Sequence, residues 1–304
     1  MSFYTLTYKL KHVIIVRKIK GVIIIREIDV SVIKKSVSDL CIQANCYLGD
    51  DVISKFKDIV RNEKTPVGRE IIEQLMENAE IAKNEEIPMC QDTGFAVVFI
   101  EIGQEVHLVG GGLDNAVNEG VSEGYTLGFL RKSMVRDPLN RINTGNNTPA
   151  VIHCSIVPGD KIKITVAPKG GGSENMSSLK MLKPAEGEEG VKSFIIETVK
   201  NAGSNPCPPI VVGVGIGGTM EKAALLAKQA LTRNLGVNSI DQDTARLEQE
   251  LLESINKLGI GPQGFGGVNT ALAVHIEKYP THIASLPVAV NIGCHAYRHK
   301  TVVI

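Results

Sequence analysis

One stretch near the middle of the chain combines an apolar run with a cluster of glycines: Ile210-Val211-Val212-Gly213-Val214-Gly215-Ile216-Gly217-Gly218. Residues 210–214 predict a buried strand, and residues 219–234 after the glycines predict a helix. The pattern G-x-G-x-x-G between a strand and a helix also occurs in dinucleotide-binding folds. In those folds an acidic residue ends the next strand, whereas Asp241 and Asp243 here open a predicted helix. The motif is therefore a weak indication of NAD binding.

Predicted helices gather in the first part of the chain. Residues 28–85 show helical spacing of apolar residues, and Thr65-Pro66 is a typical helix start, with threonine as cap and proline in the first turn. The apolar run 95–100 predicts a buried strand. A further helix is expected over residues 112–132. Three glycines in it recur at every fourth position and form a flat face that another backbone can approach closely: Gly120, Gly124 and Gly128.

Strands become more frequent towards the end of the chain. Residues 150–157 and 161–167 predict two strands, and Pro158-Gly159-Asp160 between them is a turn signal, so we expect a β-hairpin. A later helix follows Ser239, which we expect to form a capping box with Gln242. The predicted fold class is α+β, with an N-terminal helical region followed by a mixed α/β region.

The composition excludes several classes of protein. The 304 residues carry 33 basic and 33 acidic side chains, whereas nucleic-acid binders usually have a basic excess. Aromatic residues make up 4% and tryptophan is absent, which argues against a base-stacking surface. No apolar run approaches the ~18 residues that span a bilayer. Six cysteines in a chain of this length do not indicate a disulfide scaffold, so we expect a cytoplasmic protein with reduced thiols.

The first 27 residues differ from the rest of the chain. They contain short apolar runs interrupted by basic side chains, unlike the continuous apolar core of a secretory signal. We expect a β-rich tail or an added hairpin, and we treat residues 1–27 as an N-terminal extension of unknown role. The main domain is then expected to comprise residues 28–304.

Three cysteines stand in predicted loops with unusual neighbours. Cys90 lies at a helix-to-strand junction, Cys207 lies among prolines before a strand, and Cys294 directly follows a strand. The intervals between them are far longer than those of zinc fingers, but they suit an iron–sulfur cluster held between separate loops. Three thiolates can bind three irons of a [4Fe–4S] cluster and leave the fourth open as a Lewis acid. The alternative is that each is an ordinary buried cysteine.

The other cysteines lie within predicted helices or strands, where we expect them to pack in the core. They are Cys41, Cys46 and Cys154.

The loop Lys169-Gly170-Gly171-Gly172-Ser173-Glu174-Asn175 has the composition of an anion-binding loop. Its three consecutive glycines expose backbone N–H groups that can cradle a carboxylate or phosphate. The alternative is a flexible exit from the preceding strand. Arginine suits bidentate carboxylate binding, but a single charged side chain near a turn or a helix end is more often a solvated surface charge. The charged candidates near turns or helix ends are Asp92, Arg131, Arg136 and Arg141.

Several motifs, in this order, resemble the iron–sulfur-dependent class I fumarate hydratase family, in particular the α subunit of its two-subunit form. The resemblance extends from about residue 28 to the end of the chain. The matching segments are Thr65–Glu70, Ile87–Gly94, Asn143–Ala150, Lys169–Asn175 and Asn205–Pro209. The α subunit of L-tartrate dehydratase is a close relative of this family.

The resemblance implies that Cys90, Cys207 and Cys294 are the ligands of a [4Fe–4S] cluster with one open iron. It also implies substrate contacts, of which Asp92 and Arg131 are the expected catalytic groups. The implied substrate-binding residues are Gln91, Asp92, Arg131, Gly172 and Asn175. The glycines of residues 213–218 are then explained as a tight turn, which leaves an NAD-binding oxidoreductase as a distant alternative.

The implied reaction is the reversible hydration of fumarate to L-malate, and the principal alternative is the dehydration of L-tartrate to oxaloacetate. Single-chain members of the family continue beyond the third cysteine, and that portion supplies further substrate groups and the proposed base. We therefore expect a separate β subunit to carry them, in an α2β2 assembly. A cluster protein for electron transfer or redox sensing is another alternative, and it would require a fourth cysteine ligand.

Overall fold

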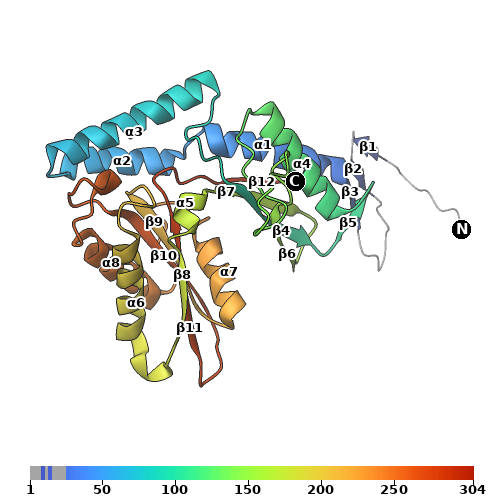
Figure 1. Ribbon diagram of the computed structural model, residues 1–304. Helices are drawn as coiled ribbons and strands as arrows, with labels where there is room; N and C mark the ends of the chain where they lie inside the picture. Colours follow the sequence, from blue (N-terminus) through green and yellow to red (C-terminus); the bar gives the residue numbers. More distant parts are fainter. Residues whose placement is uncertain (1–7, 11–12, 16–24) are drawn as a thin grey trace, which may run out of the picture. The chain divides into compact units, whose positions relative to one another are not determined.

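The computed structural model describes residues 8–10, 13–15 and 25–304, which divide into two compact units (Figure 1). The first unit comprises the described parts of residues 1–47 together with residues 86–168 and 298–304. The second comprises residues 48–85 and 169–297. Mixed helices and sheets in both units confirm the α+β fold class. Among the described residues, no helix is sufficiently long and apolar to cross a membrane.

The first unit contains two four-stranded sheets, ordered β12-β7-β4-β6 and β1-β2-β3-β5. Strands β1 and β2 pair in antiparallel fashion, which confirms the expected hairpin for the described part of residues 1–27. The elements are β1 (Tyr8–Leu10), β2 (Val13–Ile15), β3 (Arg26–Asp29), α1 (Val30–Cys46), β4 (Phe95–Gly103), β5 (Val106–Val109), α4 (Leu113–Leu127), β6 (Val151–Val157), β7 (Ile162–Lys169) and β12 (Lys300–Val303).

Helices α1 and α4 pack against each other without side chains between them at the predicted glycine face. A Cβ at Gly120 would lie 2.5 Å from the carbonyl oxygen of Lys34, and one at Gly124 would lie 2.6 Å from that of Ser38. Both distances are shorter than any real Cβ contact, so only glycine permits this approach. The apolar faces of the two helices share one core with alternate residues of β4 and β7, such as Val98 and Ile164.

The predicted hairpin between residues 150–157 and 161–167 is wrong, although both strands exist. Strand β6 pairs in parallel with β4, and β4 lies between β6 and β7 in the sheet. The turn at residues 158–160 wraps around the end of β4 instead of joining two neighbours. There, the carbonyl oxygens of Val157 and Lys161 accept hydrogen bonds from the N–H groups of Gln104 and Gly103, respectively, both of 2.8 Å.

The second unit is built on a four-stranded sheet ordered β10-β9-β11-β8. Alternate residues of β9, including Val212 and Val214, join the core beneath α6 and α8. The elements are α2 (Asp50–Asn62), α3 (Pro66–Glu85), α5 (Gly171–Glu174), β8 (Ser178–Leu182), η1 (Pro184–Glu186), α6 (Gly187–Ala202), β9 (Ile210–Gly217), α7 (Met220–Ala230), α8 (Gln242–Asn256), η2 (Pro262–Gly264), β10 (Ala271–Tyr279) and β11 (Leu286–Gly293).

The glycines of β9 serve helix packing. A Cβ at Gly213 would lie 2.3 Å from the carbonyl oxygen of Ala227, and one at Gly215 would lie 2.0 Å from that of Ala223, so α7 rests directly on the strand. Only Gly217 and Gly218, with φ of +92° and +69°, form the expected tight turn. The G-x-G-x-x-G spacing thus reflects close contact between a helix and the sheet.

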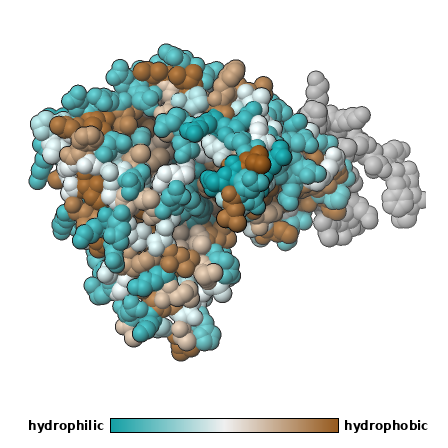
Figure 2. Space-filling model, viewed as in Figure 1, coloured by the Kyte–Doolittle hydropathy of each residue, from teal (hydrophilic) through white to brown (hydrophobic). Residues whose placement is uncertain are grey.

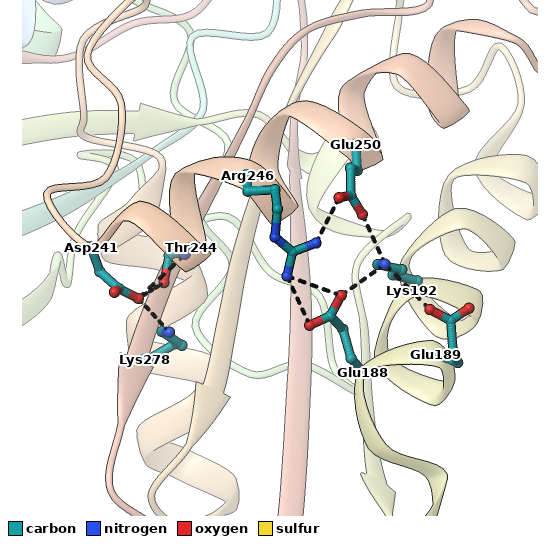
Figure 3. Close-up of polar contacts among 8 residues, drawn as sticks. All are labelled: Glu188, Glu189, Lys192, Asp241, Thr244, Arg246, Glu250 and Lys278. Carbon is teal, nitrogen blue, oxygen red and sulfur yellow. Dashed lines mark hydrogen bonds and ion pairs between the residues drawn. The ribbon is translucent and has the colours of Figure 1, made fainter.

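Helix α8 begins after Asp241, whose carboxylate accepts the N–H of Thr244 (Figure 3). The expected capping box of Ser239 and Gln242 is therefore wrong, and the N–H of Ser239 donates to Glu248 instead. The ammonium of Lys278 donates a hydrogen bond of 2.6 Å to Oδ2 of Asp241. This bond, together with the one from Thr244, lowers the pKa of the Asp241 carboxyl to about 2.

Figure 3 also shows that Lys192 of α6 bridges Glu188 of its own helix and Glu250 of α8, at 2.8 Å each. These exposed ion pairs join two helices that already share the core beneath them. Exposed pairs of this kind contribute little stability compared with such a core.

Helices α2 and α3 confirm the predicted helical region, and α3 begins at Pro66. The hydroxyl of Thr65 accepts the N–H of Gly68, as expected for a capping threonine. A groove runs between the two helices and exposes hydrophobic surface, seen as brown spheres in Figure 2. Its apolar lining includes Ile53 and Met76.

Substitution of Gly124 by alanine should destabilise the first unit, because the new methyl group would meet the backbone of α1. We expect a loss of about 1–3 kcal/mol in the free energy of unfolding, as is typical of overpacking. Urea unfolding followed by circular dichroism measures this, with Thr126→Ala on the exposed face of the same helix as control. Equal stability of the two variants would show that α1 and α4 do not need the glycine contact.

Candidate active site

The loop that carries Cys90 is held at both ends by backbone hydrogen bonds. The N–H of Met89 donates to the carbonyl oxygen of Asn45 at 3.0 Å. Five residues on, the N–H of Gly94 donates to the carboxylate of Asp92 at 3.0 Å. Cys90 itself is partly exposed, with its Sγ 3.5 Å from Oε1 of Gln91. The predicted ligand and its two polar neighbours thus lie on one short, anchored loop.

A buried arginine that the sequence reasoning missed supports this loop from within. Arg298 is only 6% exposed, and its guanidinium donates to the carbonyl oxygen of Asp92 and to Oδ1 of Asn45, both at 2.9 Å. Its Nε is buried and has no hydrogen-bond partner among the described residues. A single arginine in the sequence gives no signal of this role, because isolated arginines are mostly surface charges.

The structure also brings Arg131 to the same loop. The hydroxyl of Thr93 donates to the carbonyl oxygen of Arg131 at 2.9 Å, and the Arg131 residue is exposed. Tyr125 of α4 lies beneath and donates its hydroxyl to the carbonyl oxygens of Thr93 and Gly94, at 2.9 and 3.0 Å. Burial raises the pKa of Tyr125, so its hydroxyl remains a proton donor.

The two other arginine candidates do not join this group. Arg136 and Arg141 are exposed in the segment that follows, where Arg141 donates to the carbonyl oxygen of Pro138. In the first unit, the predicted residues that come together are therefore Cys90, Gln91, Asp92 and Arg131.

In the second unit, the loops of Cys207 and Cys294 lie side by side. The carbonyl oxygen of Cys207 accepts the N–H of His295 at 3.2 Å and lies 3.1 Å from Nδ1 of the same residue. The side-chain Nε2 of Gln263 lies 3.2 Å from Nδ1 of His295 and donates a hydrogen bond of 2.8 Å to the carbonyl oxygen of Pro208. The turn before β9 is thus tied to the end of β11.

The predicted loop of residues 169–175 contains a single helical turn, α5, rather than an irregular loop. Asn175 caps the turn and is exposed, as is Gly172. A Cβ at Gly172 would lie 3.8 Å from the carbonyl oxygen of Asn205, two residues before Cys207. The glycine turn therefore lies next to the cysteine turn of the same unit.

A buried polar network fixes α5 from below. The ammonium of Lys169 donates to the hydroxyl of Ser173 at 2.7 Å and lies 3.4 Å from the carboxylate of Glu174. Glu174 also pairs with Lys228 and accepts a hydrogen bond of 3.0 Å from Asn291 of β11. Two lysines and one carboxylate leave this network with an excess of positive charge.

The charges of the network reach the cysteine at the end of β11. Burial lowers the pKa of Lys169 to about 8, while Glu174 and Cys294 oppose that shift. Asn291 lies three residues before Cys294, and its Oδ1 is buried without a hydrogen-bond partner among the described residues. Lys169 therefore lies close enough to Cys294 for their charges to interact.

The three predicted cluster ligands belong to different units, Cys90 to the first and the other two to the second. Across residues 8–10, 13–15 and 25–304, no group of three or more His, Cys, Asp or Glu residues is placed to hold a metal ion. The ligand set therefore stays a prediction. Their surroundings do differ from those of core cysteines, since none of the three is buried.

The expectation for the remaining cysteines is confirmed in part. Cys41 and Cys46 are buried in α1, where burial raises the pKa of both thiols. The expectation for Cys154 is wrong, because that residue is exposed on β6 at the end of its sheet.

Comparison with known proteins places the chain in one family. The sequence model described as "Fumarate hydratase (Fumerase)" matches residues 34–303. The "Putative L(+)-tartrate dehydratase subunit alpha" of Methanocaldococcus jannaschii is 44% identical over 268 residues, covering 86% of this chain and 94% of the relative. The L(+)-tartrate dehydratase subunits alpha of Escherichia coli O157:H7 and Shigella sonnei are each 34% identical, covering 90% of this chain and 91% of the relative. The chain belongs to the fumarate hydratase (Fumerase) family and is a hydro-lyase.

Proposed function

We propose that this chain is the α subunit of an L-tartrate dehydratase, which removes water from L-tartrate and yields oxaloacetate. The observation that carries this proposal is the 44% identity to a relative of that name over 86% of the chain. In the reaction one carbon loses a proton and its neighbour loses hydroxide. The resulting enol then becomes the ketone of oxaloacetate, so no electron carrier is required.

Reversible hydration of fumarate to L-malate is the second candidate. It is favoured by the match of residues 34–303 to the fumarate hydratase family. L-tartrate differs from L-malate by one additional hydroxyl group, and a site that pairs this group can discriminate strongly between them.

The donor set of the three loops fits a [4Fe–4S] cluster held by Cys90, Cys207 and Cys294. Iron–sulfur clusters take thiolate ligands, and each of these cysteines lies in a turn with its residue accessible rather than in the core. When bound, such a cluster with one open iron supplies a Lewis acid that makes hydroxide a better leaving group.

The protein groups around the cysteines can bind and orient a dicarboxylate. Exposed Arg131 suits bidentate pairing with one carboxylate, while Gln91 offers an amide beside Cys90. Gly172 and Asn175 offer backbone and amide donors for another carboxylate. Asp92 shapes its loop through Gly94, and in our proposal it contacts a substrate hydroxyl or orients an arginine of the site. Holding both ends of the substrate positions the hydrogen that is removed.

We further propose that a β subunit supplies the general base and the remaining substrate groups, in an α2β2 assembly. The curated relatives are named as alpha subunits, which supports a second kind of chain. General base catalysis typically contributes a factor of ~10²–10⁴, so the α chain alone should be nearly inactive.

Substrate identity can be tested with the anaerobically purified complex of both subunits. We expect kcat/KM for L-tartrate to exceed that for L-malate by about 100-fold or more, because unpaired polar groups in the site disfavour the smaller substrate. Steady-state assays on L-tartrate, D-tartrate and L-malate measure this. Efficient turnover of L-malate with none of L-tartrate would establish the second candidate instead.

The ligand assignment can be tested by serine substitution of single cysteines. Cys90→Ser, Cys207→Ser and Cys294→Ser should each lose iron, because a hydroxyl is a poor substitute for a thiolate. Cys154→Ser is the matched control and should retain four irons per chain. Iron and sulfide analysis of the anaerobic proteins measures both, and full iron retention in Cys294→Ser would contradict the assignment.

The role of Arg298 can be tested by Arg298→Met, which keeps the bulk of the side chain but removes the donors to Asp92 and Asn45. Two acceptors, one of them on buried Asn45, would lose this donor, so we expect a loss of about 1–3 kcal/mol in the free energy of unfolding. Iron should also be lost more rapidly, because the Cys90 loop is no longer supported. Urea unfolding and iron-release rates check this against the exposed control Arg246→Met. Unchanged values in both would remove Arg298 from the supporting structure.

A further inference from the structure

Strand β6 (Val151–Val157) is the end of the sheet β12-β7-β4-β6 (Figure 1). Among the strands that the structure describes, only β4 pairs with it, so the opposite edge of β6 has no partner strand there. Pro149 and Pro158 stand close to either end. The exposed edge is thus a segment of seven residues with defined limits.

This edge has none of the devices by which proteins usually protect exposed strands. Lysine, proline or a bulge along an edge normally prevents pairing with other chains. The sequence Val151-Ile152-His153-Cys154-Ser155-Ile156-Val157 contains no lysine, acidic residue or proline. Ile156 is 75% exposed and Val151 is 39% exposed, and Cys154 is exposed between them. A strand with this character is expected to be covered in the native assembly.

The sequence of β6 is also nearly the same when read in either direction. Val151 corresponds to Val157 and Ile152 to Ile156, with Cys154 at the centre. Only His153 and Ser155 differ, and an imidazole and a hydroxyl can hydrogen-bond to each other. In an antiparallel pair related by a two-fold axis, residues at equal distances from the centre lie opposite each other. A strand with this symmetry therefore forms matched pairs with its own copy.

The burial pattern agrees with this pairing. Ile152 and Ile156 lie on the same face of β6, and Ile152 packs against the core beneath α1 and α4. Ile156 is absent from that core and is mostly exposed. Pairing with a second copy would place Ile156 opposite Ile152 of the other chain, so the exposed isoleucine would continue the apolar face of a joined sheet.

We propose that β6 is the contact between two copies of this chain, in which the two strands pair in antiparallel fashion about a two-fold axis at Cys154. The sheets of the two first units then form one continuous sheet. A strand of the β subunit is the competing occupant, but a foreign strand would not require self-complementarity. This proposal depends on no catalytic assignment, so it stands or falls separately from the proposed function.

The variant Ile156→Lys tests the contact, because it places a charge opposite Ile152 of the second copy while the side chain is exposed in the single chain. Light scattering on size-exclusion fractions of Ile156→Lys should show a complex with one α chain instead of two. The dissociation constant between the two α chains should rise at least tenfold. The matched control is Ile283→Lys, at an isoleucine that is 92% exposed in the second unit and should leave the mass unchanged. Circular dichroism checks that both variants are folded.

Cross-linking provides an independent readout. Directly opposed residues of antiparallel strands have Cα atoms about 4.5–5.5 Å apart. Bismaleimidoethane should therefore link two α chains of the holoenzyme through Cys154, and Cys154→Ser should abolish the link. Two outcomes would overturn the proposal: Ile156→Lys retaining two α chains without a Cys154 cross-link, or Ile156→Lys releasing the β subunit while the α chains stay paired.

Discussion

The direct contact between the backbones of α1 and α4 is the constraint on which the first unit depends. Because Gly120 and Gly124 have no side chains, the two helices approach until backbone meets backbone. This contact fixes the ends of both helices, and each end carries a residue that binds the Cys90 loop. Asn45 at the end of α1 accepts hydrogen bonds from Met89 and Arg298. Tyr125 near the end of α4 donates its hydroxyl to the backbone of the residues before β4. Two small residues in one helix thereby determine where the Cys90 loop lies.

The second unit repeats the same physical solution with a helix and a strand. Gly213 and Gly215 allow α7 to rest on β9, and the opposite face of that strand is covered by α6 and α8. With both faces packed, β9 and its neighbour β11 hold the turns of Cys207 and Cys294 at the same end of the sheet. The bond between Cys207 and His295 then joins those turns. The glycine pattern resembles a nucleotide-binding motif, but its physical role is steric.

Local features of the fold could be predicted from the sequence, because their causes are local. The capping pair Thr65-Pro66, the apolar strand from Phe95 and the glycine face of α4 each depend on residues within a few positions. The pairing of β6 with β4 could not be predicted, since the turn at residues 158–160 looks the same whether its strands are neighbours or have a third strand between them. The exposure of Cys154 could not be predicted either, because a strand sequence that is only partly apolar does not show whether the strand lies at the edge of its sheet.

In the candidate site, too, some residues could be predicted from the sequence and others could not. The motifs around Cys90, Cys207 and Lys169 stand out in the sequence because proline and glycine occur there in unusual density. Arg298 and Asn291 carry no such mark, yet one holds the carbonyl group of Asp92 and the other holds Glu174 beneath the glycine turn. Supporting residues of this kind are recognised only when distant segments have been brought together.

The discontinuity of the first unit has a consequence for biosynthesis. Its sheet includes β12, and its buried arginine joins Asn45 across 253 positions of sequence. Contacts between such distant residues form slowly, because the intervening chain must be ordered first. On the ribosome, the helices and early strands of this unit emerge long before residues 298–304, and the second unit is synthesised almost entirely in between. The nascent first unit must therefore wait, with the pairing edge of β7 uncovered, until residues 298–304 leave the exit tunnel.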